Sequence, residues 1–187
     1  RMYGFTPYQL TGIQKGIQFL HGVVKYGQLV KKLIDKYPNS HEIIKMNGDY
    51  NEWADKWQTV ILLNGGTTNK NFTNIGTLNQ HLEELKKNGI VLSEMYEPDL
   101  GDQLTAVVFI VDEKVFNKKD YPEFIDYVIT NGKNIDYTEM DPAFITYEKF
   151  SLATELEELE LARDWRDLLG GDKNVFLRGF LQNFRLA

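Results

Sequence analysis

The chain alternates short apolar runs with longer segments in which apolar residues recur every three or four positions. The short runs lie at 2–5, 59–63, 90–96 and 104–111, and the helical spacing lies at about 11–38 and 77–89. Short runs predict strands, and the longer spacing predicts helices. The resulting order of strand, helix, strand, helix, strand, strand predicts an α/β fold, a small mixed β-sheet of about four strands with helices on its faces. The run at 59–63 is apolar throughout, which predicts a central strand.

The first predicted helix carries two parallel stripes of side chains. It begins at Thr11, whose pairing with Gln14 is typical of a capping box, and it ends near Pro38. An apolar stripe, expected to be buried, consists of Ile13, Ile17, Leu20 and Val24. A polar stripe, displaced by one residue or about 100° around the helix, consists of Gln14, Gln18, His21 and Lys25. We expect the polar stripe to line a groove beside the core, although such rows can also be solvated surface.

The second predicted helix, 77–89, has the same kind of start. Thr77 and Gln80 repeat the capping-box pattern, and Gly89 ends the helix. Its buried face is predicted to consist of Leu78, Leu82 and Leu85. Between the two helices, residues 39–52 are polar and predict a loop, with a possible short helix at 51–57.

After residue 112 the pattern becomes more helical and more acidic. Residues 121–130 and 151–169 predict helices, the second closed by Gly170 and Gly171 with Leu152, Leu156 and Leu159 on one side. The aromatic residues between them, which we expect to pack, are Tyr137, Phe144, Tyr147 and Phe150. Phe176, Phe180 and Phe184 predict a docked terminal helix with a basic tip formed by Arg178 and Arg185. We therefore expect an α/β domain at 1–112 and an acidic, mainly helical extension at 113–187 packed on it.

The composition excludes several kinds of chemistry. The chain has no cysteine, which excludes disulfides and thiolates, and its three histidines are too dispersed for a zinc motif, so we expect no metal and no cofactor. No apolar run is long enough to cross a bilayer and no signal pattern precedes the first strand, which predicts a cytoplasmic protein without a membrane partner.

The charge is distributed unevenly. Residues 1–89 hold 11 Lys/Arg against 7 Asp/Glu, giving +4, whereas residues 90–187 hold 10 against 20, giving −10. Because acidic surfaces repel phosphates, contact with a nucleic acid would run through the first half. The acidic half can equally serve solubility alone.

A Gly/Thr/Asn-rich loop follows the strand at 59–63. Its position before a helix is where backbone N–H groups receive a phosphate or carboxylate, although the Gly-Lys-Ser/Thr ending of a Walker A motif is absent. The candidate ligand-binding residues are Gly65, Gly66, Thr67, Thr68 and Asn69. Such a loop can also be a simple turn.

The first helix resembles that of type-II peptidyl-tRNA hydrolases. The family pattern of Gln, two residues, His and a small residue matches Gln18, Phe19, Leu20, His21 and Gly22. The similarity continues, to about residue 112, with Trp53 or Trp57, the strand at 59–63, Gly89 with Ile90, and the Thr-led strand at 105–111.

The resemblance implies hydrolysis of the ester between a peptide and tRNA, which requires an oriented water, a stabilised oxyanion and bound phosphates. The candidate residues that it implies are Lys15, Gln18, His21, Asp99 and Thr105 for catalysis, with Gln14 and Lys25 for binding. The family's catalytic lysine lies seven positions before the histidine, where this chain has Gln14, and Asp102 is an alternative to Asp99. Two other interpretations remain open: a non-catalytic module that binds a nucleotide or tRNA end through residues 64–69, and a structural protein that forms a homodimer or covers a sheet edge through its extension.

Overall fold

The structure, a computed structural model, describes residues 1–69, 73–132 and 152–187, with side chains from residue 159 onward in the last range. The chain divides into two compact units. Unit 1 consists of Arg1–Asp112 together with Gly179–Ala187, and unit 2 consists of Glu113–Arg178. The segment 179–187 thus belongs to the first unit although it follows the second in the chain.

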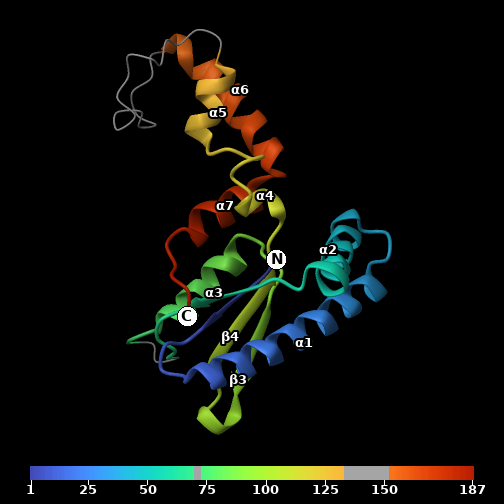
Figure 1. The fold of residues 1–187 in the computed structure, drawn as a ribbon, viewed down its shortest axis with the longest axis vertical. Coiled ribbons are helices and arrows are strands. Elements are labelled where there is room, and N and C mark those ends of the chain that lie inside the picture. Colours follow the sequence, from blue (N-terminus) through green and yellow to red (C-terminus); the bar gives the residue numbers. More distant parts are fainter. Residues whose placement is uncertain (70–72, 133–151) are drawn as a thin grey trace. The chain divides into compact units, whose positions relative to one another are not determined.

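A mixed four-stranded sheet forms the centre of unit 1 (Figure 1). The strands are β1 (Met2–Thr6), β2 (Val60–Asn64), β3 (Ser93–Glu97) and β4 (Gln103–Ile110), in the order β2-β1-β4-β3. The β1–β2 pair is parallel, and the β1–β4 and β3–β4 pairs are antiparallel. The predicted α/β class, with helices on the faces of a small mixed sheet, is confirmed.

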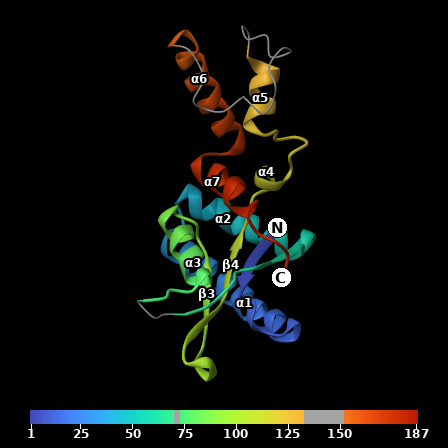
Figure 2. The same ribbon diagram turned by 90° about the vertical axis from the view of Figure 1, so that its left-hand side faces the viewer.

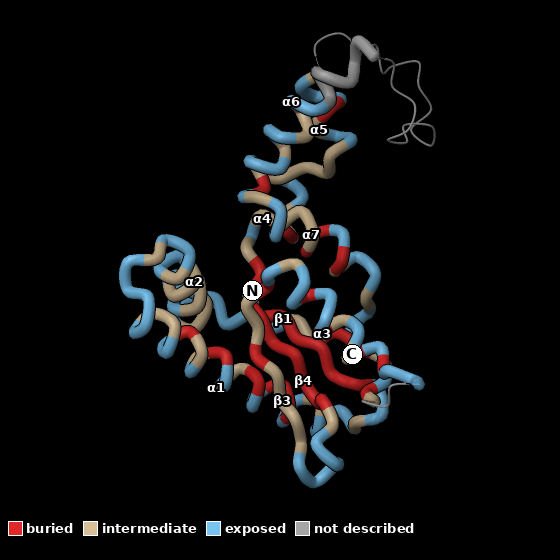
Figure 3. Tube along the Cα trace, turned by 180° about the vertical axis from the view of Figure 1, so that it is seen from behind, coloured by how far each residue is buried: buried red, intermediate tan, exposed pale blue. Residues whose placement is uncertain are grey.

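Helices cover both faces of this sheet (Figure 2). On one face lies α1 (Gly12–Lys36), whose Phe19 contacts Gly4 and whose Gly22 fits against Val108. On the other lies α3 (Thr77–Lys87), where the ring of His81 is 5.9 Å from that of Phe5. Because both faces are covered, every residue of β1 is buried (Figure 3).

The predicted buried stripe of α1 is wrong. Its members Ile13, Ile17, Leu20 and Val24 are 79%, 46%, 58% and 53% exposed, whereas the buried residues are Gln18, Phe19, Gly22, Tyr26 and Val30. Both sets have helical spacing, but the second contains glycine and glutamine and therefore gives a weaker apolar signal. Close approach to β1 and β4, which Gly22 permits, decides which face is buried.

Two further predictions for the first hundred residues are wrong. The segment 39–52 is largely helical, as α2 (His41–Glu52), continued by a π-helical turn over Trp53–Trp57. Tyr50 of α2 packs against Gly27 of α1, which a count of polar residues does not reveal. The strand predicted to be central, β2, lies at the sheet edge, and its Val60 is 44% exposed.

The edge strand β2 is covered by the segment 179–187. Asn64 N–H donates to Arg185 O at 3.0 Å, and Ala187 N–H donates to Leu62 O at 3.0 Å, so that Leu186 pairs antiparallel with Leu63. The backbone groups of an exposed sheet edge are thereby partly satisfied.

In α3 the buried leucines are as predicted, but the capping box is not. Leu78, Leu82 and Leu85 are buried. The N-cap residue is Gly76, and the Thr77 hydroxyl donates to Gly65 O at 3.0 Å. Gly89 adopts φ +69° after the helix, as its predicted role requires.

Unit 2 is helical, with α4 (Glu113–Phe116), α5 (Phe124–Asn131), α6 (Leu152–Leu169) and the start of α7 (Asp172–Leu181). The predicted end of α6 is confirmed by Gly170 and Gly171 at φ +88° and +104°. Leu159 is exposed rather than packed. The aromatic residues predicted to pack, Tyr137, Phe144, Tyr147 and Phe150, lie outside the described residues.

The predicted basic tip of α7 is wrong for Arg178. Arg185 is exposed, but Arg178 is 3% exposed, and its guanidinium donates to four backbone carbonyls, those of Lys114, Val115, Tyr121 and Pro122. A guanidinium has five N–H donors in one plane and can therefore bind several carbonyls at once. Arg178 thus stabilises the turn between α4 and α5 and is not exposed to solvent.

Candidate functional site

A pocket of about 290 Å³ opens at one end of the sheet. It lies where β1 ends and β4 begins, next to the first turn of α1 and the loop after β2. Its lining residues are Pro7, Gln9, Leu10, Gln14, Thr68, Leu100, Gln103 and Thr105. Gln14, Thr68 and Thr105 were three separately predicted site residues, and the fold brings them together.

Thr105 reaches the pocket because of an irregularity in β4. Met95 pairs with Ala106 but the next residue of β3, Tyr96, pairs with Leu104, so Thr105 is an extra residue in the ladder. Such a bulge re-aims the side chain that it displaces. Thr105 consequently faces α1, and its hydroxyl shares its single hydrogen between Gln18 Oε1 at 2.9 Å and Met95 O at 3.1 Å.

A chain of hydrogen bonds continues from Thr105 through Gln18 to a carboxylate. Gln18 Nε2 donates to Glu97 Oε2 at 2.7 Å, which fixes the amide so that Oε1 points toward Thr105. Gln18 and Thr105 are both buried, whereas Glu97 is partly exposed. This network holds the floor of the pocket in one arrangement.

The second carboxylate of β3, that of Glu94, has other partners. Glu94 accepts from Lys86 Nζ and lies 2.8 Å from the Tyr96 hydroxyl. Burial, and then the hydrogen bond to Glu94, raises the pKa of Tyr96 to about 12. Of these two acids, Glu97 is therefore the one that faces Gln18.

One buried polar atom next to the pocket has no partner. The Thr6 hydroxyl, at the end of β1 and adjacent to Pro7, is fully buried and makes no hydrogen bond. Leaving such a group unsatisfied costs roughly 1–3 kcal/mol. A group that supplied this hydrogen bond would be favoured at this end of the sheet.

In the Gly/Thr loop, most of the backbone N–H groups that were expected to bind a ligand are used in hydrogen bonds within the protein. Gly65, Gly66, Thr67 and Asn69 donate their N–H groups to Thr6 O, Asn64 Oδ1, Thr77 Oγ1 and Asn79 Oδ1. The Thr77 N–H at the start of α3 donates to Thr67 Oγ1 at 3.1 Å. These donors are thus engaged within the loop and α3, and the part of the loop that lines the pocket is Thr68.

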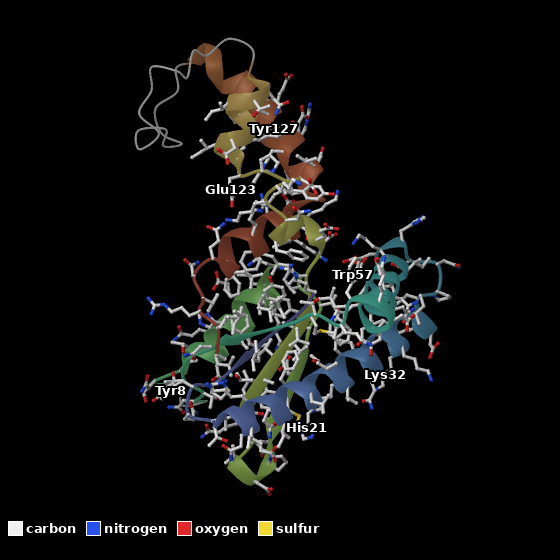
Figure 4. All side chains as sticks on the ribbon, viewed as in Figure 1. Tyr8, His21, Lys32, Trp57, Glu123 and Tyr127 are labelled. Carbon is white, nitrogen blue, oxygen red and sulfur yellow. The ribbon has the colours of Figure 1, made fainter. Side chains whose placement is uncertain are left out.

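The remaining predicted residues do not line the pocket. Lys15 is half-buried, Asp99 is exposed in the short helix Pro98–Leu100, and His21 is exposed on α1 (Figure 4). Lys25 Nζ donates to Glu94 O at 3.4 Å. The structure therefore separates the predicted set: Gln14, Thr68 and Thr105 line the pocket and Gln18 is bonded to Thr105, whereas Lys15, His21, Lys25 and Asp99 do not line it.

Among the described residues that line the pocket, none has an ionisable side chain. The charges next to the lining are of both signs, since Lys15 follows Gln14 whereas Asp99 and Asp102 adjoin Leu100 and Gln103. The helix α1 carries Asp35 as its one acid and five lysines, Lys15, Lys25, Lys31, Lys32 and Lys36. Among the described residues, no group of three His, Cys, Asp or Glu is arranged to hold a metal ion, and no helix is long and apolar enough to span a membrane.

Sequence reasoning missed Gln9, Gln103 and Glu97. Gln9 is an isolated glutamine two residues after Pro7, and Gln103 is the first residue of β4. Neither position by itself predicts a binding site. Glu97 stands in the acidic segment EPDLGDQ, where only the fold shows that it is the residue facing Gln18.

Comparisons with protein-family models, with curated proteins and with solved structures gave no match. The function of the site is therefore argued from its own geometry and from the residue pattern of α1.

Proposed function

We propose that this chain is a peptidyl-tRNA hydrolase-like protein that receives the acyl-ester end of a tRNA, or a related nucleotide-linked ester, in the pocket between α1 and β4. The observation that carries the proposal is the convergence of Gln14, Thr68 and Thr105 on one pocket. The Gln–x–x–His pattern of α1, which resembles that family, supplies Gln18 of the same site.

The chemistry of the lining suits a neutral ligand group. The amides of Gln9 and Gln103 and the hydroxyl of Thr68 offer both donors and acceptors without a charge. Gln14 offers its amide N–H groups, because its Oε1 accepts from Thr11 in the capping box of α1. An ester, a peptide amide or an adenine edge makes hydrogen bonds of this kind. A volume of about 290 Å³ holds one such group, so the rest of a tRNA would lie outside.

The phosphates of the ligand would meet the lysines of α1. Lys15, Lys25 and Lys32 lie along the same helix as Gln14. Lys32 is labelled in Figure 4. Contacts of this kind add affinity without sequence specificity and weaken as salt is raised. Binding should therefore fall steeply between about 50 and 200 mM salt, with the slope expected for several phosphate contacts.

Gln18 and Glu97 act as positioning residues in this proposal. They hold Thr105 and the start of β4 in place beneath the lining amides. Hydrolysis further needs a water and a group that accepts its proton, and Glu97 is the carboxylate nearest to Thr105 along the network.

The test is discharge of an N-acetylaminoacyl-tRNA, measured together with binding of uncharged tRNA. We expect turnover that falls about tenfold or more for Gln14→Ala and for Thr105→Val. Thr11→Ala, which removes the hydroxyl of the capping box but keeps the Gln14 amide, and Thr105→Ser, which keeps the hydroxyl, are the matched controls. Absence of both turnover and binding beside an active control enzyme would reject the proposal.

A second candidate, binding without hydrolysis, is favoured by one observation. None of the described residues that line the pocket has a titratable side chain, and Lys15, His21 and Asp99 lie outside this lining. Binding of tRNA that depends on Gln14 but shows no discharge in the same experiment would identify the chain as a sequestering module.

A further inference from the structure

The solvent side of α1 carries an apolar face that none of the described elements of unit 1 covers. Ile13, Ile17, Leu20 and Val24 point about half a turn away from the buried residues Phe19, Gly22 and Tyr26. Each is 46% exposed or more. Isolated exposed aliphatic residues are ordinary, but four in one row form a patch on the order of a few hundred Å², and such patches mark interaction sites.

The spacing of this face is symmetric. Its intervals of four, three and four residues are the same in either direction along the helix. If a second α1 lies antiparallel on it, centred between residues 18 and 19, Ile13 faces the partner's Val24 and Ile17 faces the partner's Leu20. A twofold axis requires this kind of self-complementarity, in which residue i meets j and j meets i. The pattern is also the 3–4 alternation of a two-helix seam.

The borders of the face favour a second copy over a charged partner. The flanking residues are Gln14 and His21 on one side and Gly16 and Val23 on the other, and none is a lysine, arginine or carboxylate. Lys31 and Lys32 lie beyond the overlapped length, because residue 12 of one helix faces residue 25 of the other. Self-pairing therefore brings no like charges together along the seam.

Gly16 leaves room for a close approach. A side chain added at Gly16 or at Gly12 would meet nothing within 4 Å. In the antiparallel arrangement the partner's Val23 lies over Gly16 on the same border of the seam. The four aliphatic residues and these borders together approach the roughly 1,000 Å² total that a specific interface needs, which is the low end of the range.

We propose that this chain forms a twofold-symmetric homodimer through an antiparallel pairing of α1 over residues 12–25. The interface lies about a quarter turn around α1 from the pocket side of the helix, so Gln14 borders both the seam and the pocket. The small area predicts a dimer that dissociates on dilution, with a Kd on the order of micromolar.

The oligomeric state tests the interface. Sedimentation equilibrium of the full chain across about 1–500 μM should show a mass rising from 21.7 kDa toward twice that value. Leu20→Glu should remain a monomer over the whole range, and Ile44→Glu, at a similarly exposed position on α2, should dimerise as the unchanged protein does. Both sites are exposed, so neither change removes a core contact. A chain that stays monomeric, or a dimer that Leu20→Glu does not weaken, overturns the proposal.

Disulfide trapping tests the register, because the chain has no cysteine of its own. Ile13→Cys and Val24→Cys are made separately and oxidised alone and as a mixture. Two positions 13 in the antiparallel pair are about 16 Å apart along the axis, beyond the about 7 Å that a disulfide spans between Cα atoms. Cross-linked dimer should form in the mixture and not in either variant alone. Cross-linking of the single variants without any gain in the mixture would indicate a different interface.

Discussion

Arg178 was expected at the surface, but its side chain is buried. An arginine at this position in the sequence is expected to be exposed. Its guanidinium instead donates hydrogen bonds to four carbonyls of α4 and the connection to α5. Glu123 Oε2 lies 3.8 Å from it. Two of these carbonyls belong to the single turn of α4 and two to the connection that follows it. Because so short a helix leaves its last carbonyls without helical partners, a side chain supplies their hydrogen bonds. The stability of unit 2 therefore depends on Arg178, which its position in the sequence does not indicate.

Arg178→Ala should destabilise unit 2 by about 3–5 kcal/mol, because four buried or partly buried acceptors lose their donors. Arg178→Lys should recover only part of the lost stability, since an ammonium group cannot reproduce the planar set of donors of a guanidinium. Chemical denaturation followed by Trp165 fluorescence, whose indole donates to Pro122 O, reports on this unit. Arg185→Ala, at an exposed position, is the control, and an equal effect of both variants would contradict the assignment.

His81 gives unit 1 a pH dependence. It lies among the rings of Phe5, Phe180 and Phe184, the last at 4.8 Å, and burial lowers its pKa below the ordinary 6.5, with Glu84 opposing the shift. Since the unfolded chain then takes up the proton first, the free energy of unfolding is fully retained above pH 6.5 and decreases as the pH falls below it.

Urea unfolding at pH 7.5 and at pH 5.5 should therefore show the folded state less stable at the lower pH, with part of the difference removed by His81→Gln. If the difference between the two pH values is the same in the variant, His81 does not contribute to it.

At the scale of elements, the strands and the two main helices of unit 1 could be predicted from periodicity, and the buried face of α3 was correct. The buried face of α1 was not, because glycine at position 22 and glutamine at position 18 carry no apolar signal although the sheet selects that side. The position of Thr105 in the pocket depends on a bulge in β4, and pairing register is not a local property of the chain. Thr68 was thus found from the composition and placement of its loop, Gln14 from the polar stripe of α1, and Thr105 from the family resemblance. The link between Glu97 and Gln18 required the fold.

The covering of β2 by residues 185–187 can be tested with a matched pair of prolines. Ala187→Pro removes the N–H that donates to Leu62 O, whereas the N–H of Leu186 makes no hydrogen bond to β2. Ala187→Pro should cost about 1 kcal/mol, and Leu186→Pro should cost less. Hydrogen exchange at the Asn64 amide, which donates to Arg185 O, should accelerate in the first variant only.

At the scale of the whole molecule, unit 2 is inserted between β4 and the segment that completes unit 1. Truncation after Asp112 removes Phe180 and Phe184 from the aromatic cluster and uncovers the edge of β2. We expect that truncated chain to unfold at a lower temperature and to aggregate. Replacing 113–178 by a long Gly/Ser linker should preserve unit 1, as judged by its thermal transition, because the covering segment remains. Equal stability of the two chains would show that the segment contributes little.

The return of residues 179–187 to unit 1 also sets an order of events during synthesis. The ribosome makes the four strands first, but the segment that covers the outer edge of β2 emerges only after all of unit 2 has been translated. Until then the nascent sheet has an open edge and an uncovered Phe5, a species prone to pair with other chains. Slow translation through unit 2 would prolong this vulnerable interval, so the cellular yield of this protein should depend on chaperone capacity more than its final stability suggests.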